Sequence, residues 1–137
     1  MSWLPVASFT VPGLPKAQPR PRMTRTGHVF TPPSADMWKA SIAMCGASLS
    51  GMMIDKPVSL SVDMTFPPPK HGHKHRLQLL HTSRPDVDNL LKAIMDAMTG
   101  MQIWLDDSFV SKVEATKRYG DQPGAVISIS VWEAEAA

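Results

Sequence analysis

Two short segments of the sequence carry side chains whose types and spacing could support metal-dependent chemistry. In the first, Asp86 and Asp88 follow a basic stretch, and Lys92 stands four residues after Asp88. In the second, Asp106 and Asp107 follow a tryptophan and a leucine. Mg²⁺ prefers carboxylate oxygens, and when bound it activates a water and neutralises charge on a reacting phosphate. Together the two segments indicate phosphodiester hydrolysis.

The length of the intervening chain allows these segments to meet. A helix that begins at Asp86 and ends before Gly100 is roughly 20 Å long at ~1.5 Å per residue. If Met101–Asp107 is extended, it covers roughly 23 Å at ~3.3 Å per residue. We therefore expect the return run to bring Asp107 beside Asp86 and Asp88. Three adjacent carboxylates repel one another and raise each other's pKa, a conflict that a divalent cation removes.

A simpler explanation exists for acidic residues at the start of a helix. Asp86 and Asp88 can cap free N–H groups and complement the helix dipole, which stabilises a helix by roughly 0.5–2 kcal/mol. Lys92 can form an ion pair with Asp88 or Asp96 on the helix surface. In the functional alternative, the Lys92 ammonium lies near the metal site and stabilises charge that develops on the phosphate.

The basic residues gather in two acid-free segments, although the 137-residue chain has a net charge of only +2. Residues 1–35 contain four Lys or Arg and no acid, and residues 64–85 contain another four and no acid. Such segments are typical of proteins that bind a polyanion, so we expect DNA-contacting loops at 13–33 and 67–85. The expected phosphate contacts are Lys16, Arg20, Arg22, Arg25, Lys70, Lys74, Arg76 and Arg84.

His71, His73 and His75 alternate with other residues in the second basic loop. They could bind a transition metal, but no rigid element to orient them is apparent, so we favour contact with DNA. We place Cys45 on the buried face of the first helix, Trp104 against the second, and the ten methionines in the core.

Hydropathy patterns predict the elements that position these residues. The predicted strands are Val6–Val11, Val58–Phe66, Phe109–Tyr119 and Ala125–Trp132, and the predicted helices are Ser34–Leu49 and Asp86–Thr99. Thr31 or Ser34 is available to cap the first helix. Between these elements, residues 13–33 lack periodicity and should be irregular. The order β-α-β-α-β-β predicts an α+β (mixed α/β) domain over residues 1–137, with helices packed on a mixed sheet.

The composition excludes several classes of protein. A hydrophobic share of 43% supports a globular core. The single cysteine excludes an internal disulfide framework and favours a cytoplasmic protein. No apolar run reaches the ~18–20 residues of a membrane span, and residues 1–10 lack the basic start of a signal peptide.

The sequences DVDNLLK (residues 86–92) and WLDD (residues 104–107) resemble the paired signatures of the RusA family of Holliday-junction resolvases. The segment from Lys16 to Arg22, followed by Thr31 and Pro32, is similar to the N-terminal loop of many members. The resemblance implies a RusA-like fold and a homodimeric, Mg²⁺-dependent endodeoxyribonuclease, with Mn²⁺ as a substitute. Such an enzyme cuts four-way DNA junctions symmetrically in recombination and repair, in a bacterial or phage setting.

The resemblance also implies roles for individual residues. Asp86, Asp88 and Asp107 would bind the metal, and Lys92 would be the catalytic lysine. Spacing alone leaves Asp106 and Asp107 as alternatives, and the family pattern favours Asp107. Asp106 and Asn89 would then support the site.

Two other functions remain open. The chain could be a non-catalytic DNA-binding protein whose acidic residues only cap a helix. It could also be a nuclease that acts on flaps or other branched nucleic acids. Cleavage rates on a junction, a flap and a linear duplex would separate these functions.

Overall fold

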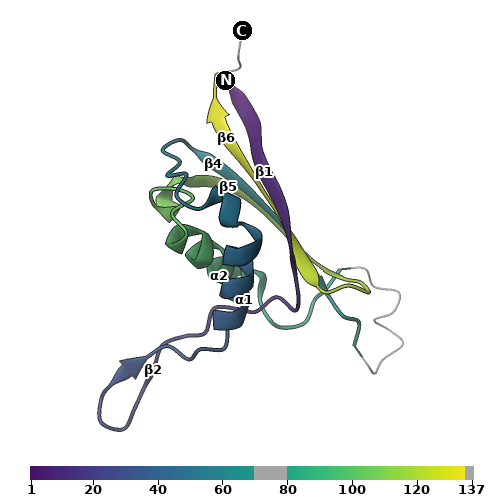
Figure 1. Ribbon diagram of the computed structural model, residues 1–137. Coiled ribbons are helices and arrows are strands. Elements are labelled where there is room, and N and C mark those ends of the chain that lie inside the picture. The colour runs from purple at the N-terminus through teal and green to yellow at the C-terminus, as the bar shows by residue number, and fades with distance from the viewer. Residues whose placement is uncertain (70–79, 135–137) are drawn as a thin grey trace.

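The computed structural model of the protein describes residues 1–69 and 80–134. Its body is a four-stranded sheet with the order β1-β6-β4-β5. The strands are β1 (Ser2–Pro12), β4 (Val58–Phe66), β5 (Val110–Tyr119) and β6 (Gly124–Glu133). The helices α1 (Asp36–Cys45) and α2 (Val87–Gly100) pack on one face of this sheet (Figure 1). The predicted α+β class is therefore confirmed.

The sheet is mixed because β4 pairs with its two neighbours in opposite senses. It is antiparallel to β6 but parallel to β5. Parallel neighbours need a crossover connection, and α2 provides it. The start of α2 therefore lies near the ends of β4 and β5, while its end lies near the start of β5. Two side-chain contacts fix this direction: Lys117 Nζ donates to Pro85 O at 2.8 Å, and Trp104 Nε1 donates to Thr99 Oγ1 at 2.7 Å.

The core lies between the helices and the sheet, where hydrophobic periodicity predicted it. Alternate residues of β4, from Val58 to Phe66, are buried, and the residues between them are half-exposed. In α2, one stripe of the helix carries the buried side chains Leu90, Ala93, Ile94 and Met98. Burial of these apolar side chains is what holds α2 against the sheet.

Both β1 and α1 differ from their predicted bounds. β1 starts at Ser2 and runs through Pro5, which was expected to bound it. An edge strand tolerates proline, and the register shifts between Pro5 and Ala7. The first helix begins at Asp36 after Ala35, with no side-chain capping bond, so neither Thr31 nor Ser34 has the expected role.

Residues 13–33 were predicted to be irregular, and this was wrong in part. They contain a small hairpin of β2 (Arg22–Met23) and β3 (Val29–Phe30), which projects from the body (Figure 1). Its turn is held by Thr24 N, which donates to His28 O at 2.8 Å, and by Gly27, whose φ is +86°. Thr24 and Gly27 are common turn residues, but the flanking strands are too short to show a pattern.

Two expectations about the core were wrong. Cys45 is exposed and is the last residue of α1. Most methionines are on the surface, and Met37 on α1 is 86% exposed. Trp104, in contrast, is buried as predicted. No helix among the described residues is long and apolar enough to cross a membrane.

Ile94 is fully buried, so truncation to Ala should leave a cavity beneath α2. We expect Ile94→Ala to lower the free energy of unfolding by about 2–5 kcal/mol. Urea denaturation monitored by tryptophan fluorescence measures the change. Met37→Ala is the control and should change stability by less than about 0.5 kcal/mol, because that side chain is exposed. A similar loss in both variants would contradict the assigned packing of α2.

Candidate metal and nucleic-acid site

The start of α2 presents two carboxylates that capping does not explain. Asp86 is the N-cap residue, with φ −72° and ψ 147°, yet its side chain makes no capping hydrogen bond. Its main-chain oxygen accepts from Leu90 N at 3.1 Å and so opens the helix. Asp88 follows in the first turn and is exposed. Capping therefore does not account for Asp86 and Asp88, and their favourable interaction with the helix dipole is the structural role that remains. Both carboxylates face solvent.

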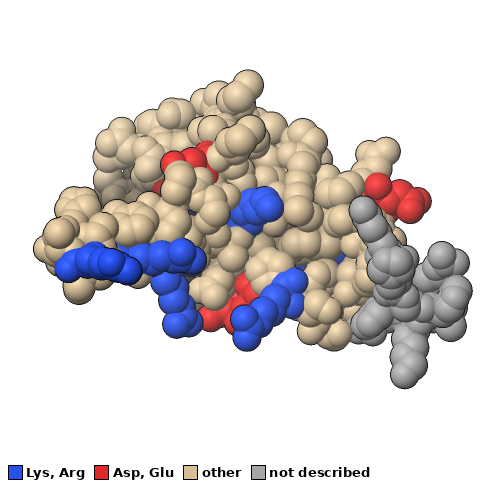
Figure 2. Space-filling view, turned by 90° about the horizontal axis from the view of Figure 1, so that it is seen from below, with Lys and Arg blue, Asp and Glu red and all other residues tan. Residues whose placement is uncertain are grey.

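An open pocket of about 650 Å³ lies against this helix start. Its lining brings Asp86 and Asn89 together with Arg20, Arg84 and Pro85. The N-terminal segment is held there by a main-chain hydrogen bond from Gln18 N to Asn89 O, 3.0 Å long. The two basic segments, distant in sequence, therefore meet beside Asp86. On the face shown in Figure 2, Lys and Arg side chains lie on either side of a small acidic group at the lower edge.

The basic residues around this pocket are electrostatically uncompensated by the described part of the chain. The ion pairs there use other cations: Lys56, Lys92, Lys112 and Arg118. Among the described residues, no acid forms an ion pair with Lys16, Arg20, Arg22, Arg25 or Arg84. Unpaired cations that share a pocket with carboxylates suit a ligand with negative charge, such as a phosphate chain.

Lys117 and His81 support the helix start, and neither was identified from the sequence. Lys117 Nζ donates to Ser83 O and to Pro85 O, both at 2.8 Å, and so fixes the turn before Asp86. His81 N donates to Lys117 O at 3.0 Å. Lys117 is near the end of a strand that returns to the helix start, but only knowledge of the parallel pairing would have revealed this.

The His81 imidazole packs against two aromatic rings that are neighbours on β4 and β5. Its centroid is 4.5 Å from that of Phe66 and 4.8 Å from that of Tyr119. Burial, together with the nearby Lys117 ammonium, lowers the pKa of His81 below its ordinary value. The imidazole is therefore neutral at neutral pH.

Lys92 forms the ion pair that the simpler explanation allowed, but with Asp96 rather than Asp88. Its Nζ lies 3.5 Å from an Asp96 carboxylate oxygen, and the lysine side chain is 62% exposed. An exposed pair of this kind contributes only about 0.2–1 kcal/mol. Little free energy therefore holds the Lys92 ammonium against Asp96.

The expectation that one chain gathers Asp86, Asp88 and Asp107 was wrong. Within the described ranges, no group of three His, Cys, Asp or Glu residues could hold a metal ion. The segment after α2 does not run back along the helix. It lies beside residues 51–54, with Ile54 N donating to Ile103 O at 2.9 Å.

The return to the helix start is made by β5 instead. From Val110 to Lys117 the strand advances roughly 23 Å at ~3.3 Å per residue, and it is Lys117 that reaches Pro85. Asp107 precedes β5 and so stays at the far end. The expectation was wrong because it assumed that Met101–Asp107 runs back along α2, whereas β5 does so.

Asp106 and Asp107 differ in what their carboxylates do. Asp106 accepts a hydrogen bond from Ser108 N at 3.2 Å and caps a short 3₁₀ helix, η3 (Asp107–Phe109). The bonds from Ser108 lower the pKa of Asp106. Asp106 therefore has a local structural task, whereas Asp107 is exposed and is the freer ligand of the two.

The remaining predicted DNA contacts fall in two groups. Arg22 and Arg25 lie on the exposed hairpin of β2 and β3, and Lys16 lies on the segment between β1 and Gln18. Residues 70–79 are outside the described part of the chain, and they include Lys70, Lys74, Arg76, His71, His73 and His75.

Comparison with known proteins defines the class. The profile of the family described as Endodeoxyribonuclease RusA matches residues 12–130, which include both acidic segments and the first basic loop. The chain belongs to the RusA family of endodeoxyribonucleases.

Two relatives are similar to this chain. An uncharacterised Bacillus subtilis protein, YqaN, is 32% identical over 133 residues, which is 88% of this chain and 93% of that protein. The crossover junction endodeoxyribonuclease rusA of Lactococcus phage r1t is 39% identical over 61 residues. That match spans 44% of each chain.

The lowered pKa of His81 should be visible in the pH dependence of stability. The unfolded chain binds a proton at this position more readily than the folded chain, so stability falls as pH drops below about 6.5. His81→Phe keeps a ring packed against Phe66 and Tyr119 but removes the titrating group. Urea unfolding between about pH 7.5 and 5.5 should therefore show a smaller loss in the variant. Equal losses would contradict the proposed cause of the shift.

Proposed function

We propose that this protein is a divalent-metal-dependent endodeoxyribonuclease that resolves four-way DNA junctions. The observation that supports this most is the convergence of Asp86, Arg20 and Arg84 on one pocket in a RusA-family chain. Arginines without acidic partners bind the phosphate backbone, and exposed carboxylates between them have the chemistry to hold a metal against that backbone. Symmetric cleavage of a junction fits a role in recombination and repair in the cytoplasm of a bacterial or phage-infected cell.

The donor set at the start of α2 fits Mg²⁺ and accepts Mn²⁺. Mg²⁺ keeps several waters and is commonly held by one or two carboxylates together with substrate phosphate oxygens. Asp86 and Asp88 would supply those carboxylates, because neither is held by a capping bond. The bound ion would supply an activated water and neutralise charge on the phosphate.

The other residues at the site would act on the DNA directly. Arg20 and Arg84 bind phosphates on either side of the scissile bond and hold the strand over Asp86. Lys92 exchanges Asp96 for the phosphate oxygens and stabilises charge that develops there during hydrolysis. Asn89 supports the pocket by holding Gln18 through its main-chain oxygen.

A homodimer would reconcile the family pattern with the position of Asp107. Asp107 lies at the far end of α2 from Asp86, so a third carboxylate must reach the pair from a second copy or through rearrangement of its own segment. A two-fold symmetric dimer also presents two sites, as two symmetric cuts require. We therefore propose that the second copy supplies this ligand.

Asp88→Asn should abolish metal-dependent nicking of a synthetic four-way junction, with a loss of at least about 100-fold, because an amide is a poor Mg²⁺ ligand. Binding should remain, since it depends on the arginines. Asp121→Asn is the control, an exposed aspartate in the turn before β6 that does not line the pocket at Asp86. Electrophoresis of nicked products and a gel-shift assay give the two readouts. Tight binding by the wild type without cleavage in Mg²⁺ or Mn²⁺ would instead establish a non-catalytic DNA-binding protein.

Mixing two inactive variants tests the shared site. If each site combines carboxylates of both subunits, a mixed dimer of Asp88→Asn and Asp107→Asn chains retains one intact site. We expect unfolding and refolding of the mixture to restore single-strand nicking that neither variant shows alone. Lack of restoration, with dimers confirmed by light scattering, would place Asp107 in the site of its own chain or outside the site.

A further inference from the structure

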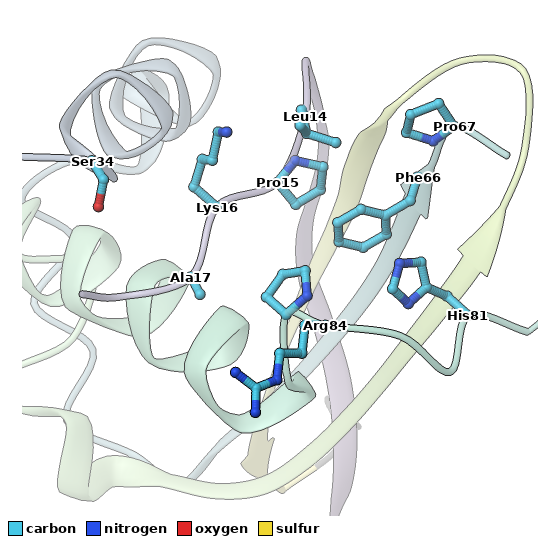
Figure 3. A pocket seen from close by; sticks show the side chains of 10 residues that line it. Leu14, Pro15, Lys16, Ala17, Ser34, Phe66, Pro67, His81 and Arg84 are labelled. Carbon is cyan, nitrogen blue, oxygen red and sulfur yellow. The ribbon is translucent and has the colours of Figure 1, made fainter. Parts of the chain in front are cut away.

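A second pocket, of about 400 Å³, opens beside the metal and nucleic-acid site (Figure 3). Arg84 and Pro85 line both pockets, so the two adjoin at the turn that precedes α2. In Figure 3, Phe66 and His81 form one wall, and Lys16 and Arg84 lie toward the opposite side. A ligand that spans both pockets would therefore pass over Arg84.

The walls of this second pocket are mostly apolar and partly aromatic. Leu14, Pro15, Ala17, Phe66 and Pro67 supply carbon surfaces, and none of the described residues that line the pocket is acidic. The cations Lys16 and Arg84 are in no ion pair with the described residues. Apolar walls with cations at the edge suit a flat, uncharged ring system that carries a phosphate.

His81 gives this pocket a polar group that can distinguish one ring edge from another. The neutral imidazole has one donor and one acceptor nitrogen, and packing against Phe66 and Tyr119 fixes the plane of the ring. Its main chain is tied to Lys117, the residue that also fixes the turn before Asp86. The orientation of His81 is therefore coupled to the geometry of the cleavage site.

We propose that this second pocket receives one unpaired nucleobase of the DNA strand whose phosphate lies at Asp86, with His81 as the residue that selects the base. The proposal rests on the proposed function and deepens it by naming the determinant of base preference beside the cut. The base enters against the exposed carbon surfaces of Leu14 and Pro67, with the buried Phe66 beneath it, and Lys16 and Arg84 hold its phosphates.

Such a pocket also explains how a nuclease of this kind could favour branched DNA. A base inside a continuous duplex must be unpaired and unstacked before it can enter, which costs a few kcal/mol. A base next to a branch point has already lost part of its stacking and pairing. The same pocket therefore selects both the structure of the DNA and the base beside the cut.

The test uses a set of four-way junctions that differ only at the nucleotide beside the branch point. That nucleotide is A, C, G, T or an abasic residue, and binding is measured without a divalent metal. We expect the wild type to bind the best base at least about fivefold more tightly than the abasic junction, as stacking of a single base allows. 2-Aminopurine at this position should become more fluorescent on binding.

Two variants and a control separate the pocket from general binding. Ala17→Leu fills the pocket and should bind intact and abasic junctions equally. His81→Phe keeps the aromatic packing and should bind all four bases alike. Ala40→Leu makes the same change at an exposed position of α1 and should behave as the wild type. If Ala17→Leu does not fold, His81→Phe still tests the proposal.

The outcomes distinguish this proposal from the proposed function. Equal binding of abasic and intact junctions by the wild type, or unchanged base discrimination in His81→Phe, would overturn the base pocket even if junctions are nicked. Absence of nicking in Mg²⁺ or Mn²⁺ would overturn the nuclease proposal while the metal-free binding data still report on the pocket. Competition by free deoxynucleoside monophosphates at the same concentration as the junction would show that the pocket binds a free nucleotide instead, which would also overturn the proposal.

Discussion

The parallel pairing of β4 with β5 is the constraint on which the rest of this structure depends. Two parallel neighbours cannot be joined by a tight turn, so the chain must cross over the sheet, and α2 is that crossover. The helix must therefore run antiparallel to β4 and β5. Its first residue, Val87, lies where β4 and β5 end, and its last, Gly100, lies where β5 begins. The separation of Asp86 from Asp107 along the helix follows from this direction.

The parallel pairing of β4 with β5 also brings together the residues that hold the start of α2 in place. Because β5 ends beside the start of α2, Lys117 can hold the carbonyls of Ser83 and Pro85. Because β4 ends there too, Phe66 can pack on His81. The N-terminal segment reaches the same place by leaving the edge strand β1 and binding Asn89. A helix start, two strand ends and a basic loop thus meet at one edge of the sheet.

The fold determines which charged residues lie close to one another. A net charge of +2 describes a nearly neutral protein. Yet the described residues of the two acid-free segments keep their cations out of ion pairs, whereas Lys56, Lys92, Lys112 and Arg118 elsewhere in the chain are paired with acids. The unpaired arginines then share a pocket with Asp86. Because a bound cation would offset the carboxylates, the edge of the sheet would be more attractive to DNA than the formal charge implies.

The sequence by itself determined the local features of this protein. Alternation from Val58 to Phe66 and the stripe from Leu90 to Met98 predicted a strand and a helix, because burial of one face requires those periods. The paired acidic signatures indicated the family, and their residues could be named. The hairpin at Arg22–Phe30 was not predicted, because strands of two residues are too short to show an alternating hydropathy pattern.

The tertiary structure alone decided which of these residues meet. The chain after α2 is long enough for Asp107 to lie beside Asp86. In the structure, however, β5 is the segment that runs back along α2, so Lys117 rather than Asp107 lies at the helix start. Nor could local pattern reveal that Arg20 and Arg84 share a pocket, or that His81 packs against Phe66 and Tyr119. The physical reason is that periodicity reports which face of an element is buried, whereas the pairing of distant strands is set by packing across the whole domain.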